Sequence, residues 1–271
     1  MKIFDVHVHI FPDRIADRAV NAIGSFYENF NMEGDGRLET AIRAMDAAGI
    51  TRCAAHSVAT SAHQVDAIND FVMDAWRRYP ERILPFAAMH PDLPDPAATA
   101  EAAIARGFRG VKIHPEIQGF RLDDPAVLDM LAPFEGRLPI LVHCGDYRYD
   151  NSSPERIKRV LRRFPRLRLI CAHLGGWTVW REAWRRLAGE DIYVDTSSAL
   201  FALSPGEAVR IIRAYGVDRA LYGTDYPMWL PGDELRRFDR LPLTQDEREK
   251  ILWTNHLALF PEQMSSNGTK P

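Results

Sequence analysis

Short apolar runs rich in valine and isoleucine alternate along the chain with longer segments of helical spacing. Runs of this length and composition are typical of strands, and near-continuous apolar runs are typical of strands buried on both faces of a parallel sheet. The runs are residues 3–9, 51–58, 83–90, 110–115, 139–145, 167–176, 192–197 and 219–227. The pattern therefore predicts eight strands.

The segments between these runs carry apolar residues at spacings of three and four, which predicts helices. Several begin with serine or aspartate followed by proline, and several end at glycine or before proline, which are the expected start and stop signals. The clearest are residues 39–49, 64–80, 95–107, 124–136, 153–165 and 204–216. A last helix is expected at residues 244–260, packed on the outside of the fold.

Eight strand-then-helix units predict an α/β protein with a (β/α)8 TIM barrel. A doubly wound open sheet is the alternative, but that fold usually has a glycine-rich turn after its first strand, and residues 10–18 contain none. No linker or low-complexity segment divides the chain. We expect one domain at residues 1–260 and a flexible tail at residues 261–271.

Composition excludes several classes of function. The formal net charge is −3 and the charges are interspersed, so nothing favours nucleic-acid binding. No stretch approaches the ~20 apolar residues of a membrane span, and no apolar signal segment precedes the first strand. The three cysteines lack metal or disulfide spacing, so we expect a cytoplasmic protein.

Polar side chains, most of them histidine, occupy the ends of the expected strands. In order along the chain they are His7, His9, His56, His90, His114, His143, His173, Asp195 and Asp225. Barrels of this type carry their functional groups at the carboxyl ends of the strands. Seven of the nine histidines would therefore meet at one mouth of the barrel.

The first strand places His7 and His9 on one face, because side chains alternate along a strand with a period of two. Asp5 would share that face, whereas Phe4, Val6 and Val8 would point the other way. Two histidines on a solvated edge strand are the plain alternative. Imidazole is the commonest metal ligand, and nitrogen and oxygen donors without a thiolate suit zinc, manganese or iron(II).

Six strand-end motifs resemble, in the same order, those of the amidohydrolase superfamily. They are "DVHVH", "GVKIHP", "ILVHCG", "LICAHLGG", "YVDTS" and "YGTDYP", within residues 2–260. More narrowly, they resemble the amidohydrolase-related branch that includes aminocarboxymuconate-semialdehyde decarboxylase. The resemblance implies that His7, His9, His143 and Asp225 bind a metal ion and that His173 is a catalytic histidine.

Some members of the superfamily hold two metals bridged by a carbamylated lysine after the fourth strand, where Lys112 is the candidate. Counting by twos places His114 at the mouth and Lys112 one layer deeper, which favours one divalent metal, zinc first, with manganese or iron(II) as alternatives. Lys112 would then be a buried charge partner, with Asp5 as its candidate. Asp195 is expected to orient a metal-binding histidine.

The substrate is expected to contact side chains on the loops at the same mouth. The candidates are His114, Arg148, Trp177 and Tyr226. An arginine can hold a carboxylate through two parallel hydrogen bonds, although Arg148 could equally be solvated. The segment 12–37 is a candidate lid.

These observations predict a metal-dependent hydrolase that uses an activated water on an amide, lactone or ester bond of a small metabolite, with Asp225 accepting the proton. One alternative is a metal-dependent decarboxylase of an aromatic or muconate-like acid, and another is a barrel that binds metal or metabolite without turnover. The expected partners are a small-molecule substrate and, through outer helices, a second copy of the chain. Neither nucleic acid nor a membrane is expected.

Overall fold

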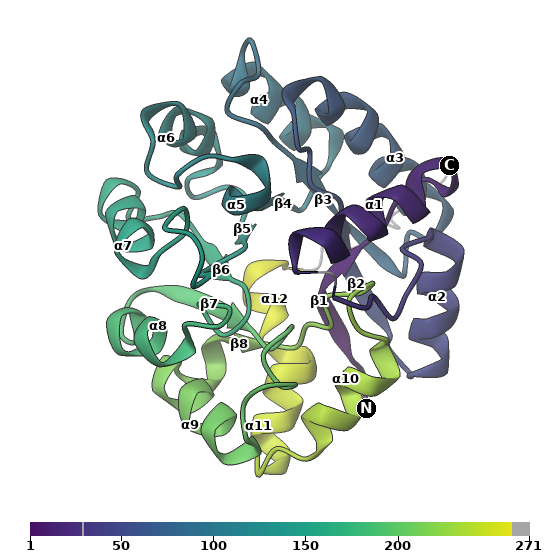
Figure 1. Cartoon of the computed structure of the whole chain (residues 1–271), viewed down its shortest axis with the longest axis vertical. Helices are drawn as coiled ribbons and strands as arrows, with labels where there is room; N and C mark the ends of the chain where they lie inside the picture. The colour runs from purple at the N-terminus through teal and green to yellow at the C-terminus, as the bar shows by residue number, and fades with distance from the viewer. Residues whose placement is uncertain (29, 262–271) are drawn as a thin grey trace, which may run out of the picture.

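Eight parallel strands form one sheet in chain order, with helices around it (Figure 1), which confirms the predicted (β/α)8 barrel. The computed structural model describes residues 1–28 and 30–261. The strands are β1 (Phe4–His9), β2 (Arg52–His56), β3 (Ile83–Ala88), β4 (Gly110–Ile113), β5 (Ile140–Val142), β6 (Leu169–Cys171), β7 (Ile192–Asp195) and β8 (Ala220–Leu221). Each lies inside a run predicted from the sequence.

The barrel closes between β1 and the segment that follows β8. The amide of Val6 donates to the carbonyl of Tyr222 at 2.9 Å, and the amide of His9 donates to Tyr226 at 2.8 Å. In the opposite direction, the amide of Asp225 donates to the carbonyl of His7 at 2.9 Å. These bonds hold the His7–His9 segment directly beside Asp225.

The helices of the described residues pack around the barrel or across its two ends, and each of the six clearest predicted segments coincides with one of them. The helices are α1 (Asp13–Phe26), α2 (Leu38–Ala47), α3 (Val65–Arg78), α4 (Pro96–Arg106), α5 (Pro115–Gln118), α6 (Pro125–Leu131), α7 (Pro154–Arg163), α8 (Trp180–Leu187), α9 (Pro205–Tyr215), α10 (Pro231–Asp239), α11 (Gln245–Glu249) and α12 (His256–Leu259). A proline opens α4, α7 and α9, and the Asp95 carboxylate caps α4 by accepting from the Ala98 amide at 2.8 Å. No helix among the described residues is both long enough and apolar enough to span a membrane.

The C-terminal segment differs from the expectation of one helix on the outside. It breaks into α11, a π-helical turn (Lys250–Thr254) and α12, and Figure 1 shows α12 near the centre of the ring. The His256 ring stacks on Phe4 at 4.1 Å, and Leu259 and Phe260 join the apolar cluster inside the barrel. This segment therefore covers Phe4 and the apolar interior at the base of the barrel. Of the expected tail at 261–271, all but Pro261 lies outside the described residues.

Strand β1 does not alternate regularly, because its register with β2 shifts between Asp5 and Val8. Phe4 and Val6 both belong to the inner apolar cluster, whereas Val8 belongs to the cluster between sheet and helices. The expectation that Phe4, Val6 and Val8 share one face is therefore wrong. A bulge of this kind re-aims side chains, and here it sets His7 and His9 above an apolar interior.

Candidate active site

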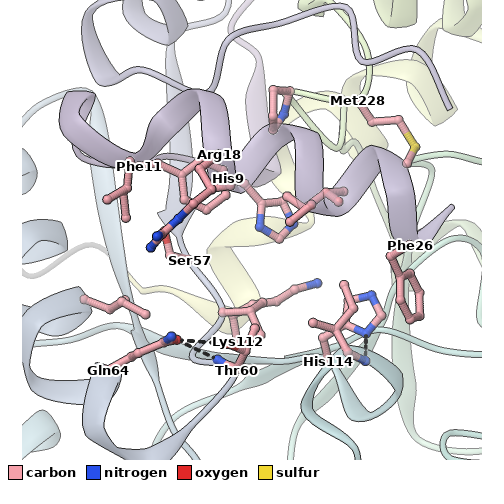
Figure 2. Close-up of a pocket in the computed structure, with 18 of the residues that line it drawn as sticks. His9, Phe11, Arg18, Phe26, Ser57, Thr60, Gln64, Lys112, His114 and Met228 are labelled. Atoms are coloured by element: carbon pink, nitrogen blue, oxygen red, sulfur yellow. Dashed lines mark hydrogen bonds between the residues drawn. The ribbon is translucent and has the colours of Figure 1, made fainter. Parts of the chain in front are cut away.

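The strand ends meet at a cavity of about 680 Å³ at one mouth of the barrel, a volume within the usual range for small-molecule sites. Its lining includes His7, His9, Lys112, His114, His143, His173 and Asp225. Helix α1 lies across this mouth and contributes residues from Arg14 to Phe26 to the lining (Figure 2). The segment predicted as a candidate lid therefore covers the site.

The proton positions of His7 follow from its hydrogen bonds. Its Nδ1 lies 3.0 Å from the Asp195 carboxylate, which can only accept, so Nδ1 carries the proton and Nε2 presents a lone pair. Asp195 also accepts from the backbone amides of His173 and Ser197, each at 3.0 Å. The His7 Nε2 lone pair faces Asp225 Oδ1 at 3.3 Å, and Nε2 of His9 lies 3.5 Å from the same oxygen.

His143 and His173 face each other in the same way. His143 Nε2 donates to the Gly145 carbonyl at 3.0 Å, and His173 Nδ1 donates to the Ser197 carbonyl at 2.9 Å. The remaining nitrogens, His143 Nδ1 and His173 Nε2, lie 3.0 Å apart with a lone pair on each. Two facing lone pairs repel each other, so this pair requires a cation or a proton between or beside them.

The donor atoms fit a divalent cation. Three groups of side chains offer ligand atoms that all lie within 4.8 Å of one another: His7, His9 and His56; His7, His173 and Asp225; His114, Glu116 and His143. His143 is thus connected to the His7–Asp225 group through His173 and does not fall in one tight group with the other three expected ligands. The set contains nitrogen and oxygen donors and no thiolate, which suits zinc, manganese or iron(II).

Burial keeps His7, His9 and His143 neutral, which is the form that binds metals. Burial and then the nearby Lys112 charge hold the pKa of His7 well below its usual range, and burial does the same for His143. Burial lowers the pKa of Lys112 to about 8. Burial opposes ionisation of Asp225, but the hydrogen bonds from His9 and from the Ser198 hydroxyl help to leave its pKa below the usual value, so the carboxylate is ionised.

Two site residues adopt backbone conformations that are rare outside glycine. His173 has φ 60° and Asp225 has φ 63°, and they lie two and four residues after the ends of the short strands β6 and β8. Ile170 and Ala172 point into the barrel, so alternation alone would turn His173 outward. The left-handed turn at His173 brings its ring back to the mouth, and such strained positions cluster at functional sites.

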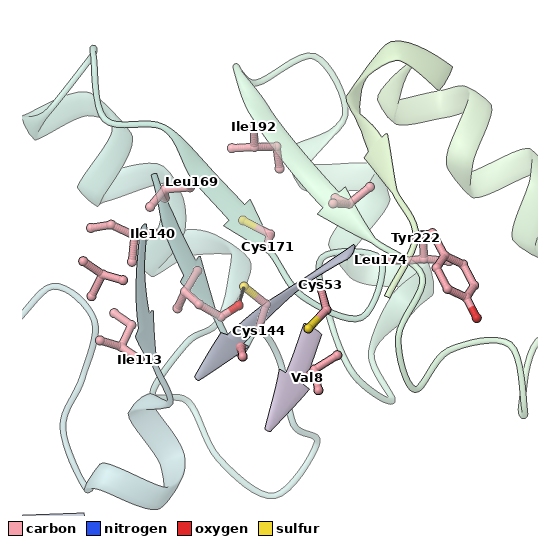
Figure 3. Close-up of a cluster of buried hydrophobic side chains, with 14 of the residues drawn as sticks. Val8, Cys53, Ile113, Ile140, Cys144, Leu169, Cys171, Leu174, Ile192 and Tyr222 are labelled. Carbon is pink, nitrogen blue, oxygen red and sulfur yellow. Dashed lines mark hydrogen bonds between the residues drawn. The ribbon is translucent and has the colours of Figure 1, made fainter. Parts of the chain in front are cut away.

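Cys171 does not share the inward direction of the His173 ring, although it lies only two residues earlier in the chain. Figure 3 shows Cys171 in the apolar cluster outside the strands, together with Cys53 and Cys144. All three cysteines are buried and free.

Lys112 and Asp5 do not pair with each other as expected. Lys112 Nζ lies 3.0 Å from His7 Nε2, inside the site. Asp5 accepts from the amides of His7 and Thr224 at 3.0 Å each and from the Thr224 hydroxyl at 2.6 Å. Asp5 therefore links the bulge in β1 by hydrogen bonds to the turn that carries Asp225. Burial raises the pKa of Asp5 to about 7.

Of the four side chains expected to contact substrate, only His114 lines the cavity. Both edges of the Arg148 guanidinium are used, because Asp146 accepts two hydrogen bonds at 2.9 and 2.7 Å and the Phe26 carbonyl accepts a third at 2.7 Å. Tyr226 is fully buried and its hydroxyl donates to Asp35 at 3.1 Å. Trp177 packs behind Tyr27, with the ring centroids 4.8 Å apart.

Tyr27 is a cavity residue that the sequence analysis missed. His114 Nδ1 accepts the Ile117 amide at 3.3 Å, so Nε2 carries the proton and donates it to the Tyr27 oxygen at 2.9 Å. The hydroxyl hydrogen of Tyr27 is therefore free to point into the cavity. No motif marks this tyrosine, because its place depends on how α1 lies over the barrel.

His56 and Glu116 were also not assigned a role. Among the described residues, neither nitrogen of the buried His56 ring has a hydrogen-bond partner. Oε2 of Glu116 also lacks a partner there. His56 lies against His9, with ring centroids 4.4 Å apart. Burial raises the pKa of Glu116 to about 8, so this carboxyl is protonated at neutral pH.

A family model described as "Amidohydrolase" matches residues 4–261 of the chain. Comparison with curated proteins gave no match. Among solved structures, an uncharacterised TIM-barrel protein, Bb4693 from Bordetella bronchiseptica, is 22% identical with a TM-score of 0.77, over 96% of this chain and 98% of that chain.

Two decarboxylases are among the other similar structures. The 2,6-dihydroxybenzoate decarboxylase from Rhizobium is 20% identical with a TM-score of 0.69, over 96% of this chain and 98% of that chain. A dihydroxybenzoic acid decarboxylase from Polaromonas sp. JS666, solved with manganese and the inhibitor 2-nitroresorcinol, is 17% identical with a TM-score of 0.72, over 96% of each chain. At these identities the likeness shows the fold alone.

Proposed function

Because the chain belongs to the amidohydrolase family, we propose that it is a metal-dependent hydrolase acting on an amide, lactone or ester bond of a small metabolite. The observation that carries this proposal is the pair of facing lone pairs on His143 and His173, 3.0 Å apart beside the His7–Asp225 pair. Nothing but a cation or a proton relieves that repulsion, and a hydrolase of this kind requires the cation.

His7, His9, His143 and Asp225 would hold the ion. Zinc is the first candidate for this ion, and manganese and iron(II) are the alternatives. When bound, a divalent ion lowers the pKa of a water toward ~7 and polarises a carbonyl group. Asp225 is positioned to serve both as ligand and as base, since its Oδ2 accepts from the Ser198 hydroxyl at 2.6 Å while Oδ1 faces His7 and His9. We propose that Asp225 accepts the proton of the attacking water.

His173 and Tyr27 would act on the substrate side. His173 Nε2 can take up a proton and deliver it to the leaving group, because the Ser197 carbonyl fixes the opposite nitrogen. Tyr27 can donate its hydroxyl hydrogen to the scissile carbonyl oxygen, because His114 already donates to the phenolic oxygen. His114 would thus orient Tyr27.

Decarboxylation of a small acid is the second candidate. The same residues could hold the ion, and Arg14, Arg18 and Lys112 give the cavity a positive lining that suits a carboxylic acid. The similar structures named as decarboxylases agree with this alternative. Arg148 no longer supports it, because its guanidinium is bound to Asp146 and Phe26.

Isotope labelling separates the two reactions. A screen of lactones, cyclic amides, esters and benzoic acids with zinc or manganese would be run in H2¹⁸O and separately in D2O. Hydrolysis places ¹⁸O in a product carboxylate and releases no carbon dioxide. Carbon dioxide release with deuterium at the vacated carbon would contradict the hydrolase proposal and establish the alternative.

A further inference from the structure

The cavity lining includes a second group of polar side chains besides the proposed metal ligands. Figure 2 shows Arg18, Ser57, Thr60 and Gln64 on the side of the cavity opposite His114 and Phe26. Arg18 comes from α1, and the other three come from the segment between β2 and α3. Arg18 and Thr60 are exposed, so this end opens to solvent.

Apolar side chains join the two ends. From α1 come Ile15, Ala19, Ala22 and Ile23, and from elsewhere come Val58, Ile68, Ile117 and Met228. They line the rest of the cavity without offering side-chain hydrogen bonds. A ligand that spans this cavity must therefore have an apolar body.

The charge of the lining is positive. Asp225 is the single carboxylate among the described residues that line the cavity, and the proposed cation would neutralise it. Arg14, Arg18 and Lys112 are the cations of the lining, and among residues 1–28 and 30–261 no carboxylate forms an ion pair with Arg14 or Arg18. A concave apolar surface with uncompensated positive charge attracts anions.

Gln64 adds a donor whose direction is fixed. Its Oε1 accepts from the Thr60 amide at 2.9 Å and from the Thr60 hydroxyl at 3.2 Å. The amide group is thereby oriented, and its NH2 is left without a partner among the described residues. A guanidinium and an amide NH2 on the same side of one cavity can supply directional donors for a carboxylate.

We propose that this open end is a subsite for a carboxylate, with Arg18 as its main charge and Gln64 as its second donor. The substrate is then an acid with an apolar body, whose carboxylate binds at Arg18 while its reacting bond lies at the metal-binding end. Only the position of the reacting bond at the metal-binding end rests on the proposed function.

The test measures binding without turnover. Calorimetry at low ionic strength would compare 4-phenylbutyrate with the neutral 4-phenylbutan-1-ol on the zinc-loaded protein. Arg18→Gln should weaken 4-phenylbutyrate binding about tenfold, as expected for loss of one charge-assisted hydrogen-bonded contact, and change 4-phenylbutan-1-ol binding less than twofold. Arg43→Gln, on the exposed side of α2 away from the cavity, is the matched control and should change neither.

Four results would overturn the subsite. Arg18→Gln could weaken both ligands equally, or the wild-type protein could fail to bind 4-phenylbutyrate at millimolar concentration. Chelation could abolish carboxylate binding while Arg18→Gln leaves it intact, which would place the carboxylate at the metal. Tighter, Arg18-dependent binding of phenyl phosphate would contradict the carboxylate assignment. If no substrate is hydrolysed yet Arg18→Gln still loses 4-phenylbutyrate, the proposed function fails and the subsite stands.

Discussion

At the scale of single residues, the direction of each imidazole proton decides what the site can bind. Carbonyl and carboxylate acceptors fix one nitrogen each of His7, His143 and His173, so the opposite nitrogens present lone pairs to the same small space. Such acceptors normally orient metal-binding histidines. The sequence could identify these histidines as a set, but the acceptors Ser197 and Gly145 act through backbone atoms and leave no pattern of side chains.

Loss of His143 should remove metal and activity together, whereas loss of His173 should remove activity and leave most of the metal. His143→Ala deletes a proposed ligand, while His173→Ala removes the group proposed to transfer a proton. Elemental analysis of both variants after expression with added zinc, together with their activity on a substrate found in the screen, checks this. Equal metal loss from His173→Ala would make His173 a ligand and contradict its assigned role.

Tyr27 offers a separate test, because its proposed hydrogen bond acts on the reacting carbonyl. Tyr27→Phe keeps the ring against Trp177 and removes only the donor, so kcat should fall by about 10²-fold or more, with little change in KM or zinc content. His114→Gln should give an intermediate loss, since it removes the group that orients Tyr27. A Tyr27→Phe variant with wild-type kcat would limit Tyr27 to a packing role.

At the scale of elements, the sequence predicted the eight strands better than the turns that follow them. Barrel strands are buried on both faces, so their sequences are apolar runs that can be recognised without the structure. The bulge between Asp5 and Val8 and the left-handed turn at His173 depend on partners distant in the chain, such as Thr224 for Asp5. A strict count by twos therefore misplaced Phe4 and Val6 while still placing His7 and His9 together.

The loops after β5 and β6 pack so closely that one glycine is required. Gly145 has φ 71°, and a Cβ there would lie 2.7 Å from the Cα of Gly176. Its carbonyl also accepts the proton of His143. Gly145→Ala should therefore cost about 2–4 kcal/mol of unfolding free energy and lower the zinc content.

Gly189→Ala is the matched control for that substitution. Gly189 has φ 93° but nothing within 4 Å of an added Cβ, so only backbone strain of about 1 kcal/mol is expected, with normal zinc content. Denaturant unfolding and elemental analysis of the two variants measure the difference. Equal costs would mean that the approach of the two loops is not what requires Gly145.

At the scale of the whole molecule, the lining of the cavity could not be predicted, because it depends on how α1 lies over the barrel. The sequence favoured Arg148, on the loop after the fifth strand, as the arginine of the site and did not mark Arg18. In the fold, Arg148 binds Asp146 and the Phe26 carbonyl at the end of α1, which ties the helix to the loop after β5. Arg18 lines the cavity that this arrangement leaves.

Strand β1 and helix α12 meet at the base of the barrel, where His256 stacks on Phe4. Burial outweighs the hydrogen bond to the Trp253 carbonyl and lowers the pKa of His256 from 6.5 to about 4. Below pH 6.5 the unfolded chain takes up a proton that the folded chain does not. This contribution to stability is therefore complete above pH 6.5 and is lost as the pH falls toward 4, by about 3 kcal/mol.

Replacing His256 by phenylalanine keeps a ring against Phe4 and removes the titrating group. The unfolding free energy of His256→Phe should therefore fall less than that of the wild type between pH 7 and pH 4.5, with the difference approaching about 2–3 kcal/mol. Phe260→Leu removes apolar volume from the same cluster at the bottom of the barrel and changes no titrating group. It should therefore lower the unfolding free energy by the same amount at every pH. Denaturant unfolding of the chelated protein across this range isolates His256 from the site histidines, which titrate equally in all three proteins. Parallel curves for the wild type and His256→Phe would mean that His256 is protonated in the folded barrel.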